Sequence, residues 1–279
     1  MNCSRFILTL RNRPMGGAIV PGRLAGGCLN CFQTAAKITF LIHGFNVSAG
    51  EGSRSLARLA ECLPFAQRDG ALVSVLWPGD SCAGALSYAW EGHDANLSAH
   101  ELAKFIDLYA APAAELFFVS HSLGARVVMK CIDELRAAGR KVGRVCLMAP
   151  AIDADSLADP GVYRRPASHA DKVAVLSSTK DHVLKLAYPA GDLFQAFAFF
   201  DEASGSALGL RGSRKHDSYD VPDNIRDWRI DPERESGHGH YIPDPDSSDV
   251  ARQNQRSAAE YANAVLRGDA VPLYPGPAA

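Results

Sequence analysis

The stretch "FFVSHSLGARVVMK", residues 117–130, decides the fold of this chain. A run of apolar, β-forming residues ends at Ser122, and a helix-forming segment follows it directly. A tight strand-to-helix turn of the G-x-S-x-G type needs small residues two positions before and two positions after its serine. Ser120 and Gly124 occupy these positions. The pattern therefore predicts a nucleophile elbow with Ser122 exposed at its tip.

Short apolar runs rich in β-branched and aromatic residues recur along the chain, and amphipathic segments lie between them. The runs do not alternate with polar residues, which is typical of strands that are buried on both faces of a parallel sheet. Strands and helices in this alternation predict an α/β fold with a doubly wound, mostly parallel sheet flanked by helices. The strands are expected at residues 6–10, 37–42, 71–77, 115–120, 144–149, 172–178 and 225–230, and the last helix at about 248–266.

The length and composition of the chain fit one large domain. With 279 residues, of which 47% are hydrophobic, the chain can bury a full core, although its length alone also allows two small domains. We expect a single domain over residues 1–279. A small cap or a long surface excursion is possible around residues 185–236, where the strand and helix pattern loosens into a polar, turn-rich stretch.

The charge and the cysteine content restrict the partners and the compartment. A formal net charge of -2 without a long run of Lys or Arg predicts no nucleic-acid partner and no attraction to an anionic membrane. The apolar segment near the start is too short for a signal-peptide core or a membrane span. Seven cysteines, odd in number and scattered, do not resemble a disulfide framework, so we expect a cytoplasmic protein.

Cys28 and Cys31 form a C-x-x-C motif in the segment "GGCLNC". A structural zinc site normally needs a second pair of ligands at similar spacing, and none is visible in the sequence. A redox pair normally opens a helix after a strand, whereas this pair follows the segment "PGRLAGG". We therefore expect two loop cysteines, with a metal or redox role as the weaker alternative.

A serine hydroxyl becomes a good nucleophile only when a base takes its proton and an acid orients that base. In a fold with this elbow, the acid and then the histidine follow the serine along the chain. Asp181 comes directly after an expected strand, where its carboxylate can turn back over the edge of the sheet. Asp153 and Asp155, which follow the preceding strand, are the alternatives, and a role at the edge of a pocket or in capping a loop suits them better.

Two histidines, His238 and His240, lie in the glycine-rich loop "ESGHGHYIPD" before the last helix, and either could reach Ser122. Their spacing, with Asp244 and Asp246 nearby, could instead recruit a metal ion. No third convergent ligand is evident, so we expect no metal.

Two backbone amides are candidates for an oxyanion hole. Leu123 follows the serine at the start of the helix, and Phe45 follows the segment His43-Gly44 at the end of an earlier strand. Aromatic and polar residues at or after the end of the next strand, together with one later segment, are candidates for contact with substrate, although packing is the commoner role for such aromatic residues. These candidates are Trp77, Asp80, Ser81 and the segment 193–200.

Four segments give the chain a resemblance to the α/β-hydrolase superfamily and, more narrowly, to bacterial α/β-hydrolase proteins of uncharacterised function (DUF900-like). They are "HGFNVS" (43–48), "WPGD" (77–80), "SHSLG" (120–124) and "GHGHY" (237–241), and the resemblance spans roughly residues 37–266. It implies a serine-hydrolase mechanism and leaves the substrate open. Alignment of the last segment with the "GHSYY"-like loop of these proteins matches His238 to their histidine and His240 to their first aromatic residue, which favours His238 as the base.

Together these features predict an esterase-like hydrolase that acts on a small acyl compound and requires no cofactor. Ser122 would attack the acyl carbonyl, His238 would transfer the proton, and Asp181 would orient the histidine. An acyltransferase could use the same machinery, because the fold and the triad do not set the acceptor. A binding protein without catalysis is the third alternative, and the presence of serine, acid and histidine in order disfavours it.

Overall fold

The strands form one eight-stranded sheet in a computed structural model that describes residues 5–68, 70–80, 88–187, 206–213, 220–229 and 237–269. Its strands are β1 (Arg5–Arg11), β2 (Ile19–Ala25), β3 (Lys37–Ile42), β4 (Ala71–Leu76), β5 (Glu115–His121), β6 (Val142–Met148), β7 (Lys172–Ser177) and β8 (Ile225–Arg229). Their order in the sheet is β2-β1-β4-β3-β5-β6-β7-β8. β2 runs antiparallel to β1, and every other pair of neighbouring strands in this sheet is parallel. The predicted doubly wound, mostly parallel sheet is confirmed.

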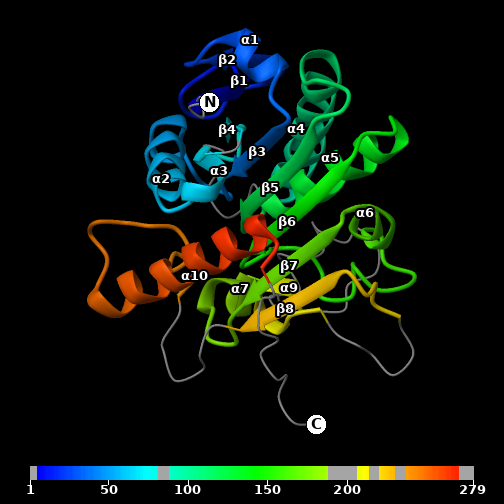
Figure 1. Cartoon of the computed structure of the whole chain (residues 1–279). Helices are drawn as coiled ribbons and strands as arrows, with labels where there is room; N and C mark the ends of the chain where they lie inside the picture. Colours follow the sequence, from blue (N-terminus) through cyan, green and yellow to red (C-terminus); the bar gives the residue numbers. More distant parts are fainter. Residues whose placement is uncertain are drawn as a thin grey trace.

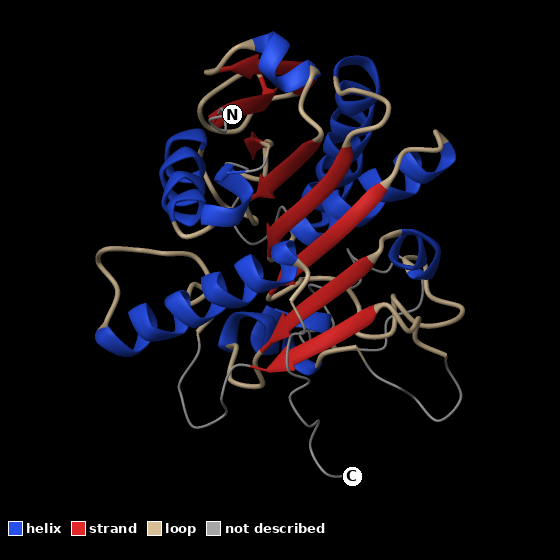
Figure 2. Cartoon of the chain, in the orientation of Figure 1, coloured by secondary structure: helices blue, strands red, loops and turns tan. Residues whose placement is uncertain are grey.

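Helices cover both faces of this sheet (Figures 1 and 2). They are α1 (Leu29–Gln33), α2 (Ala49–Glu61), α3 (Pro64–Arg68), α4 (Tyr88–Tyr109), α5 (Gly124–Ala137), α6 (Arg164–His169), α7 (His182–Ala187), α9 (Leu208–Arg211) and α10 (Asp249–Arg267). In Figure 1, α4 and α5 lie together on one face, and α2 and α10 lie on the other. Every central strand is therefore shielded from solvent on both sides, which explains why the strand sequences do not alternate.

Each face of the sheet has its own hydrophobic core. Phe40 on β3 stacks on Phe118 of β5 at 5.4 Å between ring centroids, in the core that α4 and α5 cover. The next residue on β3, Leu41, belongs to the opposite core with Leu56 of α2 and Leu266 of α10. Successive side chains of a strand point to opposite faces, so one strand supplies both cores. Full burial of each such side chain stabilises the fold by about 1.5–3 kcal/mol.

Capping residues fix the ends of the two helices on the α2 and α10 face. The Ser48 hydroxyl accepts a hydrogen bond from the Glu51 backbone N–H, and the Glu51 carboxylate accepts one from the Ser48 N–H, which forms a capping box at the start of α2. At the start of α10, the Ser248 hydroxyl accepts a hydrogen bond from the Ala251 N–H. Gly268, with φ of 86°, ends α10 in the left-handed conformation that glycine adopts at low cost.

Two elements at one edge of the sheet, β2 and α1, were missed from the sequence. β2 is an edge strand that contains proline and glycine and is exposed along much of its length, so it has no apolar run to identify it. Cys28 is the N-cap of α1, and Cys31 lies within this helix. The expectation of two loop cysteines was therefore wrong, because the pair opens a helix after a strand.

The region expected to hold a cap, residues 185–236, lies largely outside the described residues, as does the segment 193–200. Within this region, the described residues 206–213 pack over the carboxyl ends of β6 and β7. The Leu208 N–H donates to the Ile152 carbonyl at 2.7 Å, and the Ser178 N–H donates to the Gly209 carbonyl at 2.9 Å. A cap, like the single-domain organisation, stays a prediction.

Candidate active site

Ser122 occupies a strained turn between β5 and α5. Its φ is 53°, in the left-handed region that costs a residue other than glycine about 1–3 kcal/mol. The Ser122 N–H donates to the Met148 carbonyl at 3.0 Å, and the Ser122 carbonyl accepts from the Ala125 N–H in the first turn of α5 at 3.0 Å. The predicted elbow is therefore present, and neighbouring backbone holds it in its strained conformation.

Close contact between backbones explains the small residues of this turn. A Cβ atom on Gly124 would lie 2.6 Å from the His43 carbonyl oxygen, and a Cβ atom on Gly44 would lie 2.9 Å from the Ser122 Cβ. The loop after β3 is thus pressed against the elbow. Ser122 is only 6% exposed, in contrast to the exposed tip expected from the sequence.

Ser122, His238 and Asp181 form a chain of hydrogen bonds. The His238 Nε2 lies 2.8 Å from the Ser122 Oγ, and the His238 Nδ1 lies 2.7 Å from the Asp181 Oδ2. Asp181 is fully buried, and its other carboxylate oxygen accepts from the Leu184 N–H in α7 at 3.0 Å. Three residues predicted from separate segments of the chain are therefore in direct contact, at the carboxyl ends of β5 and β7.

The alternative histidine and acids lie elsewhere. His240 accepts a hydrogen bond from the Gly237 N–H at its Nδ1, over 2.9 Å, and so closes the turn that carries His238. The Asp153 carbonyl accepts from the Ser156 N–H, and Asp155 forms a similar turn with Ala158. Asp181 is the carboxylate that contacts the His238 ring.

His121, the residue before the serine, contacts the backbone of His238. Its Nε2 lies 2.8 Å from the His238 carbonyl oxygen, and the two rings lie 4.8 Å apart. Burial, and then the proximity of His238, lower the pKa of His121 to about 3, so its ring is neutral near pH 7. Because a carbonyl only accepts, the His121 Nε2–H is the donor. The sequence analysis did not predict this bond.

The loop that carries Phe45 is fixed from two sides. Asn46, with φ of 56°, donates its N–H to the Gly79 carbonyl at 2.5 Å and so joins the loops after β3 and β4. Phe45 is half-buried against the core on the α4 and α5 face. Leu123 is the N-cap residue of α5 and is buried. Both residues predicted to supply oxyanion amides therefore lie close to Ser122. Leu123 follows it directly along the chain, and Phe45 follows Gly44, whose backbone packs against Ser122.

Trp77, expected to contact substrate, is fully buried behind this loop. Its indole N–H donates to the His43 carbonyl at 2.9 Å, and its ring stacks on the His43 ring at 5.7 Å between centroids. The His43 Nδ1–H in turn donates to the Gly44 carbonyl at 2.8 Å. Burial lowers the pKa of His43 to about 4, so this ring is also neutral near pH 7. Trp77 thus supports the loop from the core.

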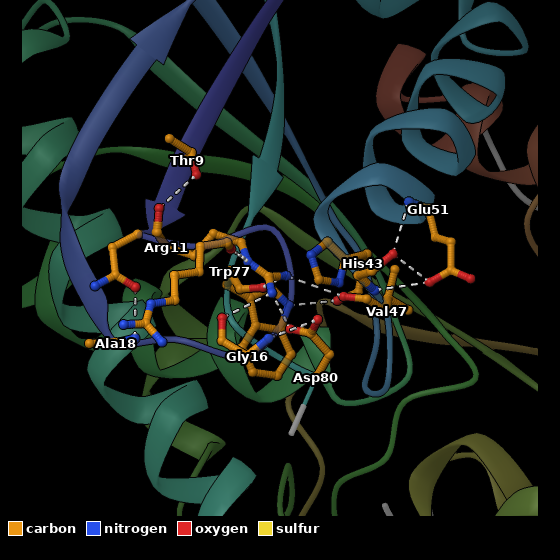
Figure 3. Close-up of polar contacts among 12 residues, drawn as sticks. Thr9, Arg11, Gly16, Ala18, His43, Val47, Glu51, Trp77 and Asp80 are labelled. Carbon is orange, nitrogen blue, oxygen red and sulfur yellow. Dashed lines mark hydrogen bonds and ion pairs between the residues drawn. The ribbon is translucent and has the colours of Figure 1, made fainter. Parts of the chain in front are cut away.

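Asp80, also expected to contact substrate, forms a buried ion pair with Arg11 at the end of β1 (Figure 3). The Arg11 guanidinium donates to the Trp77 carbonyl at 3.3 Å and to the Val47 carbonyl at 3.4 Å. Asp80 accepts a further hydrogen bond from the Gly16 N–H at 3.2 Å. Arg11, which the sequence analysis missed, therefore links the first strand to both loops near the elbow. Ser81 lies outside the described residues.

Two further properties concern the part of the chain that the structure describes. No helix there is long and apolar enough to cross a membrane. No three His, Cys, Asp or Glu side chains in these segments converge so that they could hold a metal ion.

The mostly parallel sheet, the helices on both faces and the strand-to-helix elbow define an α/β-hydrolase fold. Residues 31–192, more than half of the chain, match the family described as "Alpha/beta hydrolase of unknown function (DUF900)". The chain belongs to this family. The matched range includes Ser122 and Asp181, whereas His238 lies beyond it.

Several solved structures are similar to this chain at low identity. An esterase from Pyrobaculum calidifontis is 12% identical, with 84% of this chain and 77% of that chain covered and a TM-score of 0.41. The carboxylesterase EstE1, cloned from a metagenomic library, is 12% identical, with 85% and 81% covered and a TM-score of 0.42. The catalytic core domain of acetyl xylan esterase from Trichoderma reesei is 15% identical, with 85% and 99% covered and a TM-score of 0.41. No curated protein matches the chain.

Proposed function

We propose that this protein is a serine hydrolase that cleaves carboxylic esters through an acyl-enzyme intermediate. One observation carries the proposal: Ser122 lies on a strained elbow and is joined through both ring nitrogens of His238 to the buried carboxylate of Asp181. Membership of the α/β-hydrolase family supports it. A general base bonded to the nucleophile and oriented by a third group is the arrangement that activates a serine hydroxyl.

In the proposed reaction, the Ser122 Oγ attacks the acyl carbonyl while the His238 Nε2 takes the hydroxyl proton. The imidazolium then gives that proton to the alcohol oxygen as the ester bond breaks. Water, deprotonated by the same nitrogen, releases the acid and regenerates the serine. Asp181 holds the His238 Nδ1–H throughout, and its bond from the Leu184 N–H fixes the direction in which the carboxylate faces.

The oxyanion formed at each step would be stabilised by the backbone N–H groups of Phe45 and Leu123. The contact of Gly44 with the Ser122 Cβ supports this assignment, because it keeps the loop that carries Phe45 against the nucleophile. Leu123 supplies its amide at the N-terminal end of α5, a helix of 14 residues whose dipole also favours negative charge there. The reaction needs no cofactor, and the substrate is a small acyl compound.

A fluorophosphonate probe, which reacts with activated serines, tests the proposal. We expect it to label the wild-type protein and to leave Ser122→Ala unlabelled. Ser120→Ala is the matched control, because this buried serine lies two residues earlier on the same turn. It should label like the wild type.

Chromogenic esters of increasing acyl length then identify the substrate range. Ser122→Ala should lower turnover by about a thousandfold or more without loss of folding. A wild-type protein that neither reacts with the probe nor hydrolyses any ester would favour the binding protein without catalysis. Near wild-type turnover in Ser122→Ala would place the chemistry elsewhere.

A further inference from the structure

The C-x-x-C pair lies in a turn at one end of the strands, and Ser122 lies at the opposite end. α1 connects β2, which runs antiparallel to β1, to the start of β3, so the pair is near the amino ends of the parallel strands. Ser122 follows the carboxyl end of β5. Any chemistry of Cys28 and Cys31 is therefore separate from the proposed ester hydrolysis.

Buried aromatic contacts hold this turn in place. Phe32, the residue after Cys31, is fully buried. Its ring packs edge-on against Phe6 at 5.8 Å and in a tilted arrangement against Phe105 at 5.5 Å between centroids. Gly27, with φ of 61°, brings the chain so close to Phe6 that a Cβ atom would lie 2.4 Å from its ring. The cysteines are therefore presented from a fixed backbone.

The two cysteines themselves are free and exposed. The Cys31 N–H donates to the Cys28 carbonyl at 2.8 Å, and such a turn keeps the two Cα atoms within about 7 Å. A disulfide needs roughly 4.4–6.8 Å between Cα atoms. The turn therefore holds the two Cα atoms at a separation that overlaps the range a disulfide needs.

We propose that Cys28 and Cys31 form a redox-active dithiol that undergoes thiol–disulfide exchange with small disulfides. The Cys28 thiolate attacks one sulfur of a disulfide R–S–S–R, which forms a mixed disulfide and releases one RS⁻. The Cys31 thiolate then displaces the second RS⁻ and closes the Cys28–Cys31 bond. Both cysteines are oxidised, the small disulfide is reduced to two thiols, and the two cysteine protons end on those thiols.

The order of attack follows from the surroundings of Cys28. The backbone N–H groups of Cys31 and Asn30 at the start of α1, and then the Cys31 thiol, lower the pKa of Cys28, because they favour its thiolate. The thiolate is the reactive form. A zinc site is the other use of a C-x-x-C pair, but no third ligand joins these cysteines among the described residues.

Oxidised glutathione, followed by alkylation and tryptic mapping, tests the proposal. Residues 24–37 form one tryptic peptide that contains Cys28 and Cys31 and no other cysteine. After exposure to excess oxidised glutathione at neutral pH, this peptide should resist alkylation and should be lighter by two hydrogens than the reduced peptide. Dithiothreitol should restore both alkylation sites. A peptide that stays doubly alkylated in excess oxidised glutathione would overturn the proposal.

Single substitutions test the roles of the two cysteines. Cys31→Ser should accumulate glutathione on Cys28, because the resolving thiol is absent. Cys28→Ser should react at least several-fold more slowly, and equal rates in both variants would contradict attack by Cys28. Cys62→Ser, which changes a half-buried cysteine elsewhere, should behave like the wild type. Fluorophosphonate labelling should be the same in the reduced and oxidised protein, so either proposal can fail without the other.

Discussion

The His121 Nε2–H donates a 2.8 Å hydrogen bond to the carbonyl oxygen of His238, so the residue next to the proposed nucleophile holds the backbone of the proposed base. The bond joins the elbow to the turn at residues 237–240 across 117 positions of the chain. It adds to the contacts that His238 makes with Ser122 and Asp181 through its own ring.

His121→Phe keeps a ring but removes this donor, so we expect kcat for ester hydrolysis to fall about tenfold while KM changes less. A lost hydrogen bond to a buried carbonyl costs about 1–3 kcal/mol, and about 1.4 kcal/mol corresponds to a tenfold change in rate. His121→Gln, whose amide can donate from a similar position, should recover part of the loss. Steady-state kinetics with a chromogenic ester measures both variants.

His169→Phe is the matched control for this substitution. The His169 Nε2 makes the same kind of bond, 2.8 Å long, to the Arg140 carbonyl at a distant position. It should leave kcat unchanged. If both phenylalanine variants lower kcat equally, the effect reflects general stability and His121 has no positioning role.

Asp181→Asn should lower kcat by about 10³- to 10⁴-fold while His238 remains in place. The amide can donate a hydrogen bond to the His238 Nδ1, which favours the tautomer that carries its proton on Nε2 and cannot accept from Ser122. Asp153→Asn is the control, because Asp153 was an alternative acid and does not contact this ring. A large loss in Asp153→Asn with little loss in Asp181→Asn would contradict the assignment.

Gly44→Ala should reduce ester turnover strongly, because the added Cβ would lie 2.9 Å from the Ser122 Cβ and 3.2 Å from the His121 Nδ1. The loop must move away from the elbow, and the Phe45 amide moves with it. Gly50→Ala, six residues later in α2, meets only the Arg54 guanidinium, at 3.7 Å, and should be neutral or stabilising. Equal activity of the two variants would show that close contact at Gly44 is not required.

The buried histidines should make the protein less stable as pH falls from 7.5 to 5.5. Burial lowers the pKa of His43 to about 4 and that of His121 to about 3, whereas an unfolded histidine titrates near 6.5. Between these values the unfolded chain binds protons that the folded chain does not, so stability is fully present above about pH 6.5 and is lost below it. Each histidine contributes a slope of up to about 1.4 kcal/mol per pH unit.

Urea unfolding at constant ionic strength measures this slope. The midpoint should fall with pH, and it should fall less steeply in His121→Phe, which lacks one of the two buried histidines. A midpoint that rises toward pH 5.5, or an unchanged slope in the variant, would contradict the assignment of neutral, buried rings.

Sequence reasoning succeeded where a residue's role depends on its own segment. The core strands follow from unbroken apolar runs, and the Ser122 elbow follows from small residues at fixed spacing. The contacts of Asp181 and His238 followed from chain order and from the resemblance of the late loop. The catalytic roles of these two residues are part of the proposed function.

What the sequence could not predict depends on contacts between distant segments that neither a motif nor the chain order indicates. Arg11 looks like a surface residue after a short strand, yet it is buried against Asp80, 69 positions away. Trp77 is a residue type that often lines substrate pockets, but here it is buried and donates its indole N–H to the His43 carbonyl. β2 lacks an apolar pattern because its place at the edge of the sheet does not require one, and the setting of Cys28 was misjudged for that reason.

The separation of Ser122 from His238, 116 positions along the chain, has a consequence during protein synthesis. At roughly 5–20 residues per second, a ribosome adds His238 about 6–23 s after Ser122. During that interval the nascent chain can form the elbow and the strands on either side of it without the base. Under the proposed mechanism, a newly made protein stays chemically inert toward esters until its C-terminal segment has emerged and α10 has packed onto the sheet.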